Sequence, residues 1–172
     1  INSTFDFNLN KYIQDQTQTF FNIDNALSRL EELFGYKLDR RVVVFTHTEL
    51  KNNARYLPPY GDYLGEIQIG TPDQVSMENL NNDADVIVHE LGHHILYKHV
   101  STVEGESIIL HEGTADYLAY MIHGNEQLGE TLLKDAPYLR SNENVEGLYY
   151  DEQRFVWAQH QLGQFWSAYL TR

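Results

Sequence analysis

The chain has 172 residues, a hydrophobic content of 42% and a formal net charge of -13 at pH 7. This length and composition predict one domain around a single sizeable core, and the charge argues against nucleic acid or an anionic membrane surface as a partner. Because the chain has no cysteine, disulfides and thiolate sites are excluded, and a metal ion would need His, Asp or Glu. No apolar run approaches the roughly 20 residues of a membrane span.

The first half of the chain predicts a helix followed by strands. Apolar residues recur at helical spacing before a stop at Gly35, and they are Phe20, Ile23, Leu27, Leu30 and Phe34. The run RRVVVFT (40–46) predicts a buried strand. NNARYLPPYGDY (52–63) is rich in turn residues, and LGEIQIG (64–70) alternates like a half-exposed strand.

The chain after Asp83 is expected to be helical throughout. Residues 81–83 are good N-caps and precede an apolar run, so a helix should begin there. A second helix is predicted from about residue 106 to residue 122, ending near Gly124. A last helix is predicted from about residue 151 towards residue 172.

The predicted helix after Asp83 carries the pattern H-E-x-x-H. At about 100° per residue, His89 and His93 lie on one face one turn apart, and Glu90 lies beside them. In this pattern two imidazoles bind zinc and the glutamate deprotonates water. The other interpretation is a surface helix with solvated histidines, and a five-residue match alone does not decide between the two.

A catalytic zinc ion needs a third protein ligand, and two residues compete for that role. His99 stands where metzincin proteases have their last histidine, but Leu96 replaces the glycine that breaks the helix in that pattern, so His99 should point elsewhere. Glu112 follows His93 by nineteen residues, far enough for a second helix to return antiparallel. Asp116 follows one turn later and could accept a hydrogen bond from the second ring N–H of a histidine that binds the metal. We therefore favour Glu112, although two acids one turn apart on a solvated helix would look the same.

From about residue 53 to residue 166 the chain resembles the gluzincin metallopeptidases of the thermolysin and fungalysin kind. Four separated motifs occur in the family's order: NNARY, DVIVHELGHHI, HEGTADYLA and AQHQLGQFWSAYL. The resemblance implies that His89, His93 and Glu112 bind Zn²⁺. It also implies that Glu90 is the general base and that Asp116 supports His89.

Further roles follow from the same resemblance. His160 would stabilise the oxyanion, while Asn53 and Ala54 would hold an extended substrate at an edge strand. The position of a family calcium ligand is Asp85, but His123 stands where a second acid is expected, so calcium is not predicted. The chain after Glu112 is shorter than the helical domain of thermolysin, and the family's catalytic tyrosine has no safe counterpart here.

We therefore expect an α+β, zincin-like fold: a small mixed sheet with its edge strand at the cleft, a zinc-binding helix and a short helical C-terminal part. The whole chain, 1–172, would be one metallopeptidase domain, with a sheet-and-zinc-helix part to about residue 100. The expected activity is zinc-dependent hydrolysis of extended polypeptides, in a secreted or cell-envelope protein. A zinc-stabilised peptide-binding module without activity and a helical domain without metal are the alternatives.

Overall fold

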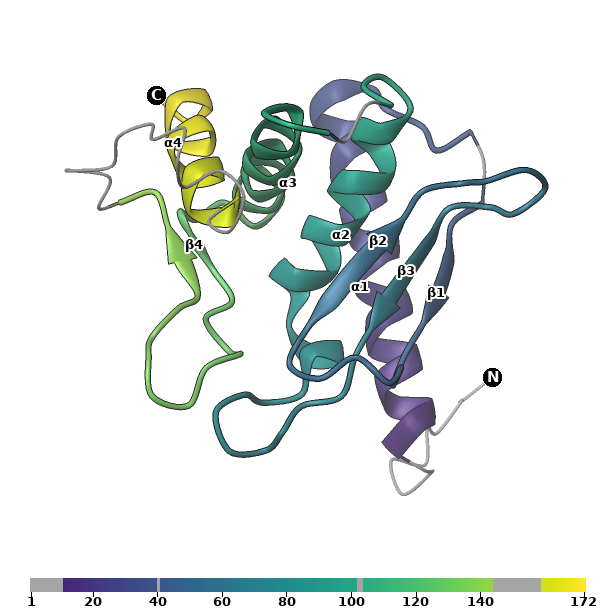
Figure 1. Cartoon of the computed structure of the whole chain (residues 1–172), viewed down its shortest axis with the longest axis vertical. Helices are drawn as coiled ribbons and strands as arrows, with labels where there is room; N and C mark the ends of the chain where they lie inside the picture. Colours follow the sequence, from purple (N-terminus) through teal and green to yellow (C-terminus); the bar gives the residue numbers. More distant parts are fainter. Residues whose placement is uncertain (1–10, 40, 102–103, 144–158) are drawn as a thin grey trace.

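The computed structural model describes residues 11–39, 41–101, 104–143 and 159–172. Over these residues the chain is a mixed α+β protein with four α-helices and a small sheet (Figure 1). The elements are, in chain order, α1 (Lys11–Phe34), β1 (Val43–Phe45), β2 (Ala54–Leu57), β3 (Glu66–Ile69), the 3-10 helix η1 (Leu80–Asn82), α2 (Ala84–Tyr97), α3 (Ser107–His123), β4 (Gln127–Leu128), β5 (Arg140–Ser141) and α4 (Gln159–Leu170).

The first helix forms as predicted and ends before Gly35, whose φ of 64° suits a glycine. Only part of its apolar face is buried. Ile23 and Leu30 enter the core, whereas Phe20 stays 71% exposed and Phe34 also faces solvent. The helical spacing therefore predicted the helix correctly but overstated the width of the face that other elements cover.

The three-stranded sheet has the order β1-β3-β2, with β1 parallel and β2 antiparallel to β3. The predicted alternation holds in β3, where Ile67 and Ile69 are fully buried and the intervening residues are not. The strand predicted within 40–46 is present as β1, but the expectation that it is buried is wrong, because β1 lies at a sheet edge and Phe45 is 47% exposed. The turn-rich segment contains the other edge strand, β2.

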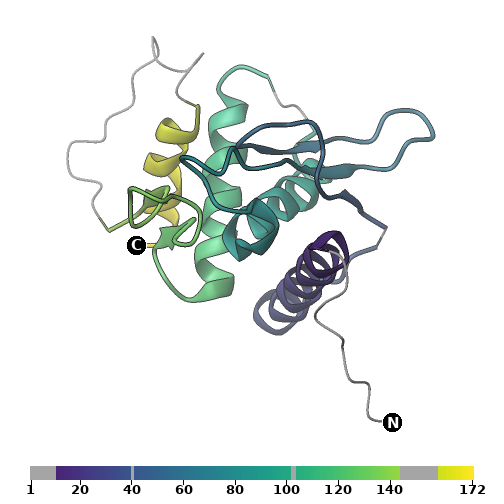
Figure 2. The same cartoon turned by 90° about the horizontal axis from the view of Figure 1, so that it is seen from below.

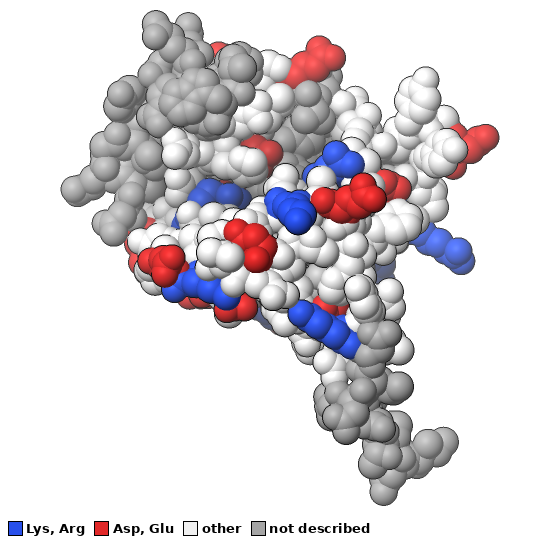
Figure 3. Space-filling view, turned by 60° about the horizontal axis from the view of Figure 1, so that its bottom comes forward, with Lys and Arg blue, Asp and Glu red and all other residues white. Residues whose placement is uncertain are grey.

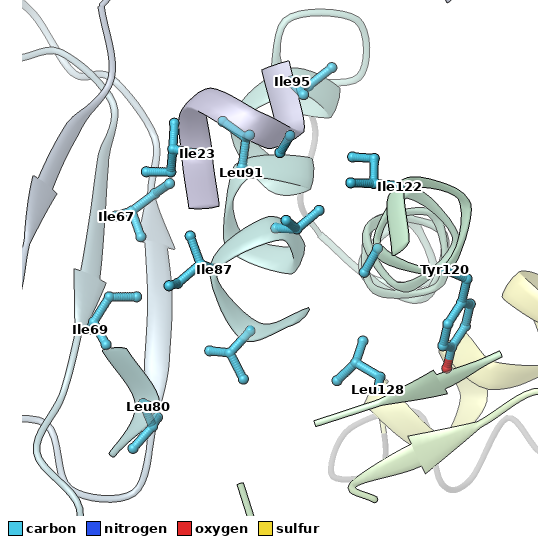
Figure 4. Close-up of a cluster of buried hydrophobic side chains, with 14 of the residues drawn as sticks. Ile23, Ile67, Ile69, Leu80, Ile87, Leu91, Ile95, Tyr120, Ile122 and Leu128 are labelled. Carbon is cyan, nitrogen blue, oxygen red and sulfur yellow. The ribbon is translucent and has the colours of Figure 1, made fainter. Parts of the chain in front are cut away.

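The core lies on both sides of α2. Ile87 and Leu91 pack with Ile67 of the sheet and with Ile122 of α3 in one buried cluster (Figure 4). Burial of each such side chain contributes about 1.5–3 kcal/mol. Figures 1 and 2 show the helices side by side in the order α4, α3, α2, α1. This packing makes α2 the central helix of the fold.

The caps of α2 and α3 match the sequence. The Asp83 side chain accepts a hydrogen bond from Val86 N (3.0 Å) at the start of α2, and Gly124 ends α3 with a φ of 73°. Helix α2 ends at Tyr97, two residues before His99.

Two further differences concern the C-terminal part. The expectation that everything after Asp83 is helical is wrong, because β4 and β5 pair as an antiparallel hairpin between α3 and α4. Strands of two residues carry no readable periodicity. The predicted start of the last helix near residue 151 lies outside the described residues, and α4 begins at Gln159. On the face shown in Figure 3, basic and acidic side chains of the described residues are interspersed.

Candidate functional site: three histidines around one carboxylate oxygen

The H-E-x-x-H pattern brings its two histidines together on α2. His89 Nε2 lies 3.1 Å from His93 Nε2, because residues four apart on a helix stack one above the other. Glu112 reaches the same point from α3, with Oε2 3.1 Å from His89 Nε2 and 3.5 Å from His93 Nε2. The structure therefore joins these three sequence-predicted residues in one cluster.

A glycine allows α2 and α3 to approach closely enough for this contact. A Cβ atom at Gly92 would lie 2.9 Å from Ala115 Cα, closer than real Cβ atoms come to a neighbour. Gly92 lies next to His93, and Ala115 follows Glu112 by less than one helical turn. The small residues thus set the distance between the helices that carry the histidines and the glutamate.

A second glycine contact brings His160 to the cluster. A Cβ atom at Gly113 of α3 would lie only 2.3 Å from Gly163 O of α4, so the two backbones touch. Trp166 Nε1 donates to Thr114 Oγ1 (2.9 Å) and fixes the relative rotation of these helices. His160 Nε2 consequently lies 3.2 Å from Glu112 Oε2, with 55% of its side chain exposed. In the spacing H-x-x-G-x-x-W, each residue one turn apart on α4 faces α3: His160 contacts Glu112, Gly163 allows the close approach and Trp166 bonds to Thr114.

The arrangement around Glu112 can hold a metal ion. Ligand atoms of His89, Glu112 and His160 lie within 4.8 Å of one another, and His93 Nε2 lies at comparable distances from the first two. Glu112 Oε2 is buried and has no hydrogen-bond partner among the described residues. Tetrahedral coordination at about 2.0–2.1 Å implies roughly 3.3 Å between ligand atoms, close to the spacings of 3.1, 3.1 and 3.5 Å seen here. The residues present therefore fit a metal ion.

Electrostatics also favours positive charge at this point. Burial lowers the pKa of His89, but its contacts with Asp116 and Glu112 outweigh burial and raise that pKa to about 10. Burial opposes ionisation of Glu112, yet His89 and His93 hold the pKa of its carboxyl well below the usual range. The cluster thus stabilises a cation, either a proton or a metal ion.

Asp116 lies directly behind His89. Its Oδ1 is 2.7 Å from His89 Nδ1, and the carboxylate is completely buried. With Nδ1–H donating to Asp116, Nε2 of the same ring presents its lone pair to the cluster. Arg140 of β5 completes the arrangement, since Nε and Nη2 donate to both Asp116 oxygens at 2.8 and 2.7 Å. Burial raises the pKa of Asp116, but Arg140 and His89 together lower it to about 2.

Sequence analysis missed Arg140. No motif includes it, and it lies in a segment that was expected to be helical. The bidentate geometry of its guanidinium is the kind that holds a buried carboxylate ionised. Its position depends on the β4–β5 hairpin, for which the sequence carries no periodic signal.

Glu90 lies next to the metal-capable cluster without joining it. The side chain is buried, and its Oε2 has no hydrogen-bond partner among the described residues. Burial raises the pKa of Glu90 above its ordinary value. A buried and unpaired carboxylate beside a cation site is suited to accept a proton.

The edge strand β2 has one side that no other described strand covers. Gly70 N donates to Asn53 O (3.0 Å), and Ala54 pairs with Ile69, so the main-chain groups of Asn53 point towards β3. Because antiparallel ladders alternate, the N–H and C=O groups of Ala54 point to the outer side of β2, away from β3. Pro58, which lacks an N–H, follows the strand and limits any further pairing.

Two cavities adjoin the cluster, and both are lined by Asn53, Ala54, His89, Glu90 and His160. The larger has a volume of about 280 Å³ and extends towards the β2–β3 hairpin. Part of the wall of the smaller cavity, of about 70 Å³, is apolar and is formed by Met77, Leu80, Val86, Leu128, Leu132 and Leu139. All four side chains of the cluster line the larger cavity, whereas only His89 and His160 line the smaller one.

The remaining histidines lie outside the cluster. His99 is exposed beyond the end of α2, and His94 Nδ1 lies 3.3 Å from Tyr56 OH. His111 is buried, and its Nε2 lies 2.7 Å from Val100 O. Its ring also stacks on that of His93 at 6.0 Å. The half-buried Tyr97 lines the larger cavity together with His111.

Asp85, where the resemblance would place a calcium ligand, contacts protein groups instead. Asp85 Oδ1 forms an ion pair with His123 Nδ1, and Asp85 Oδ2 accepts a hydrogen bond from Gly129 N at 2.8 Å. Both carboxylate oxygens are thus held by protein groups that link α2 to the end of α3 and to the segment after β4.

In comparisons with known proteins, no family model and no curated protein matches the chain. Among the described residues, no helix has both the length and the apolar character needed to cross a membrane.

Proposed function

We propose that this chain is a zinc-dependent endopeptidase with a zincin-like fold of the gluzincin type. The convergence of His89, His93 and Glu112 on one point, with Glu90 beside it, carries the proposal. Two histidines and one glutamate form a known ligand set of catalytic zinc, which leaves a coordination position open. Imidazole nitrogens, which His89 and His93 offer, are suitable ligands for Zn²⁺.

Zinc bound at these residues would lower the pKa of the attacking water and polarise the scissile carbonyl. Glu90 would take a proton from the attacking water and pass it to the leaving amine. Its burial and raised pKa support this role, because a general base works best when its pKa lies close to the working pH.

His160 would donate a hydrogen bond to the carbonyl oxygen as negative charge develops there. Partial burial lowers the pKa of His160, so the ring is mainly neutral near pH 7 and still carries one N–H donor. Its half-exposed position on the open side of the cluster leaves room for a substrate oxygen. Asp116, held by Arg140, would keep His89 in the tautomer that binds metal.

The substrate would be a polypeptide in extended conformation. The backbone groups of Ala54, which point away from β3, offer a point of β-pairing, and the apolar residues that line part of the smaller cavity suit an apolar side chain. Pairing would end at Pro58, so the paired stretch of substrate is short.

One observation favours a second function. His160 Nε2 lies 3.2 Å from Glu112 Oε2, almost as close as His89 Nε2 at 3.1 Å, and a fourth protein ligand would close the site. Closed sites are structural. The chain would then be a zinc-stabilised module that binds a peptide without cutting it. The buried, unpaired Glu90 argues for the catalytic function, because a binding module needs no base.

Cleavage of an unstructured protein such as casein by the parent chain and by Glu90→Gln separates these functions. The endopeptidase proposal expects zinc in both proteins and cleavage by the parent alone, because the substitution removes the base and leaves the ligands. Equal cleavage by both proteins would contradict the role of Glu90. Zinc binding without cleavage by the parent, together with zinc loss in His160→Ala, would establish the binding module.

A further inference from the structure

The segment before the edge strand is held by the loop that follows β3. Thr71 donates through its N–H to Leu50 O (2.8 Å) and accepts from Asn52 N (3.0 Å). Gly70 N donates to Asn53 O (3.0 Å), and a Cβ atom at Gly70 would lie 2.3 Å from Leu50 O. The two segments are therefore in backbone contact immediately beside the free edge of β2.

One exposed carboxylate organises this contact. Asp73 Oδ1 accepts from the N–H groups of Val75 (2.9 Å), Ser76 (2.9 Å) and Met77 (3.2 Å). Its Oδ2 accepts from Asn52 Nδ2 (2.8 Å) and Ser76 Oγ (2.7 Å). Asp73 N in turn donates to Asn52 Oδ1 (2.7 Å). Hydrogen bonds from Asn52, Ser76 and the loop backbone hold the pKa of Asp73 well below its usual range.

Asn52 has an unusual backbone conformation at this point. Its φ of 50° lies in the left-handed region, which residues other than glycine adopt at some cost. Both polar atoms of its side chain bond to Asp73, so the pair holds the residue in this conformation. The conformation of Asn52 sets the direction of the next two residues, Asn53 and Ala54, which line both cavities.

We propose that Asp73 is a positioning residue for the substrate. It holds Asn52 in the left-handed conformation and thereby keeps the free edge of β2 aligned with the metal-capable cluster. The inference rests on the proposed endopeptidase function. Asp73 itself lines neither cavity, so it acts through the residues that it holds, above all Asn52. A misaligned edge weakens pairing equally in the ground state and the transition state, so its loss raises KM and leaves kcat unchanged.

The test compares Asp73→Asn with Asp62→Asn, in which an exposed acid of the β2–β3 hairpin loses the same charge. Asparagine keeps the shape of the side chain but replaces a charged acceptor by an amide. The inference expects KM for an extended peptide to rise about tenfold in Asp73→Asn, with kcat within about twofold of the parent and zinc content unchanged. Asp62→Asn should match the parent in all three quantities.

A double variant provides the rescue. Asn52→Asp with Asp73→Asn exchanges the partners and restores one carboxylate opposite one amide, and aspartate tolerates the left-handed region. We expect KM to return to within about threefold of the parent. Hydrogen exchange at the Asn52 and Gly70 amides should quicken in Asp73→Asn and slow again in the double variant. This second measurement requires no activity.

The outcomes are distinguishable. Unchanged KM and unchanged hydrogen exchange in Asp73→Asn would overturn the positioning role while the proposed function stands. A loss of zinc or a fall of kcat in that variant would also overturn it, because Asp73 would then support the whole fold. If the parent cuts no peptide at all, the proposed function fails and this inference fails with it.

Discussion

The contact between Gly113 and Gly163 gives a sharp prediction, because it sets the position of His160. A Cβ atom in Gly113→Ala would lie 2.3 Å from Gly163 O, about 1 Å closer than an ordinary contact. Helix α4 would have to move outward by a similar distance. Overpacking of this kind costs about 1–3 kcal/mol of unfolding free energy. Displacement of His160 by about 1 Å should lower kcat on the order of 10²-fold.

The assay is kcat for one peptide, with zinc content and thermal unfolding measured on the same sample. Gly163→Ala offers a graded comparison, because its nearest contact, Gly113 N, would be at 2.9 Å, so a smaller effect is expected. Leu110→Ala, at an exposed position of α3, is the control and should stay within about 0.5 kcal/mol of the parent. Parent-like kcat and stability in Gly113→Ala would refute the idea that this contact positions His160.

Three other predictions concern the ligands, the buried ion pair and the edge strand. Glu112→Ala should lose zinc on dialysis whereas His99→Ala should retain it, and the reverse result would assign the third ligand to His99. Arg140→Ala should lower the free energy of unfolding by about 3–5 kcal/mol, measured by denaturant unfolding, because the buried Asp116 would lose its bidentate partner and keep only its contact with His89. A loss below about 1 kcal/mol would show that the Arg140–Asp116 pair is dispensable. A peptide N-methylated at the residue that pairs with Ala54 should bind with a higher KM, and an unchanged KM would exclude that pairing.

Local pattern was enough to predict the helices and the proximity of His89 and His93, whereas the place of His160 beside them was implied only by the resemblance. The spacing of His89 and His93 fixes their proximity on any α-helix, and the distance in sequence to Glu112 allows a second helix to return. Caps at Asp83 and Gly124 lie where their residue types predict. The caps and the proximity of His89 and His93 depend on neighbours within a few residues along the chain.

Features that depend on distant neighbours were not predicted. The exposure of Phe45 follows from the edge position of β1, which no local pattern reveals. Arg140 reaches Asp116 only because a hairpin of two-residue strands forms between α3 and α4. The close approach of α3 and α4 at Gly113 could not be predicted, because a glycine inside a predicted helix does not indicate which element packs against it.

Zinc content combined with reversible loss of activity tests the central claim most directly. The purified chain should bind about one zinc ion, lose both zinc and peptide cleavage on treatment with a chelator, and regain both when zinc is returned. Glu112→Ala should not recover cleavage at the zinc concentration that restores the parent. Peptide cleavage that persists after complete removal of metal, or a parent chain that binds no zinc, would contradict the account.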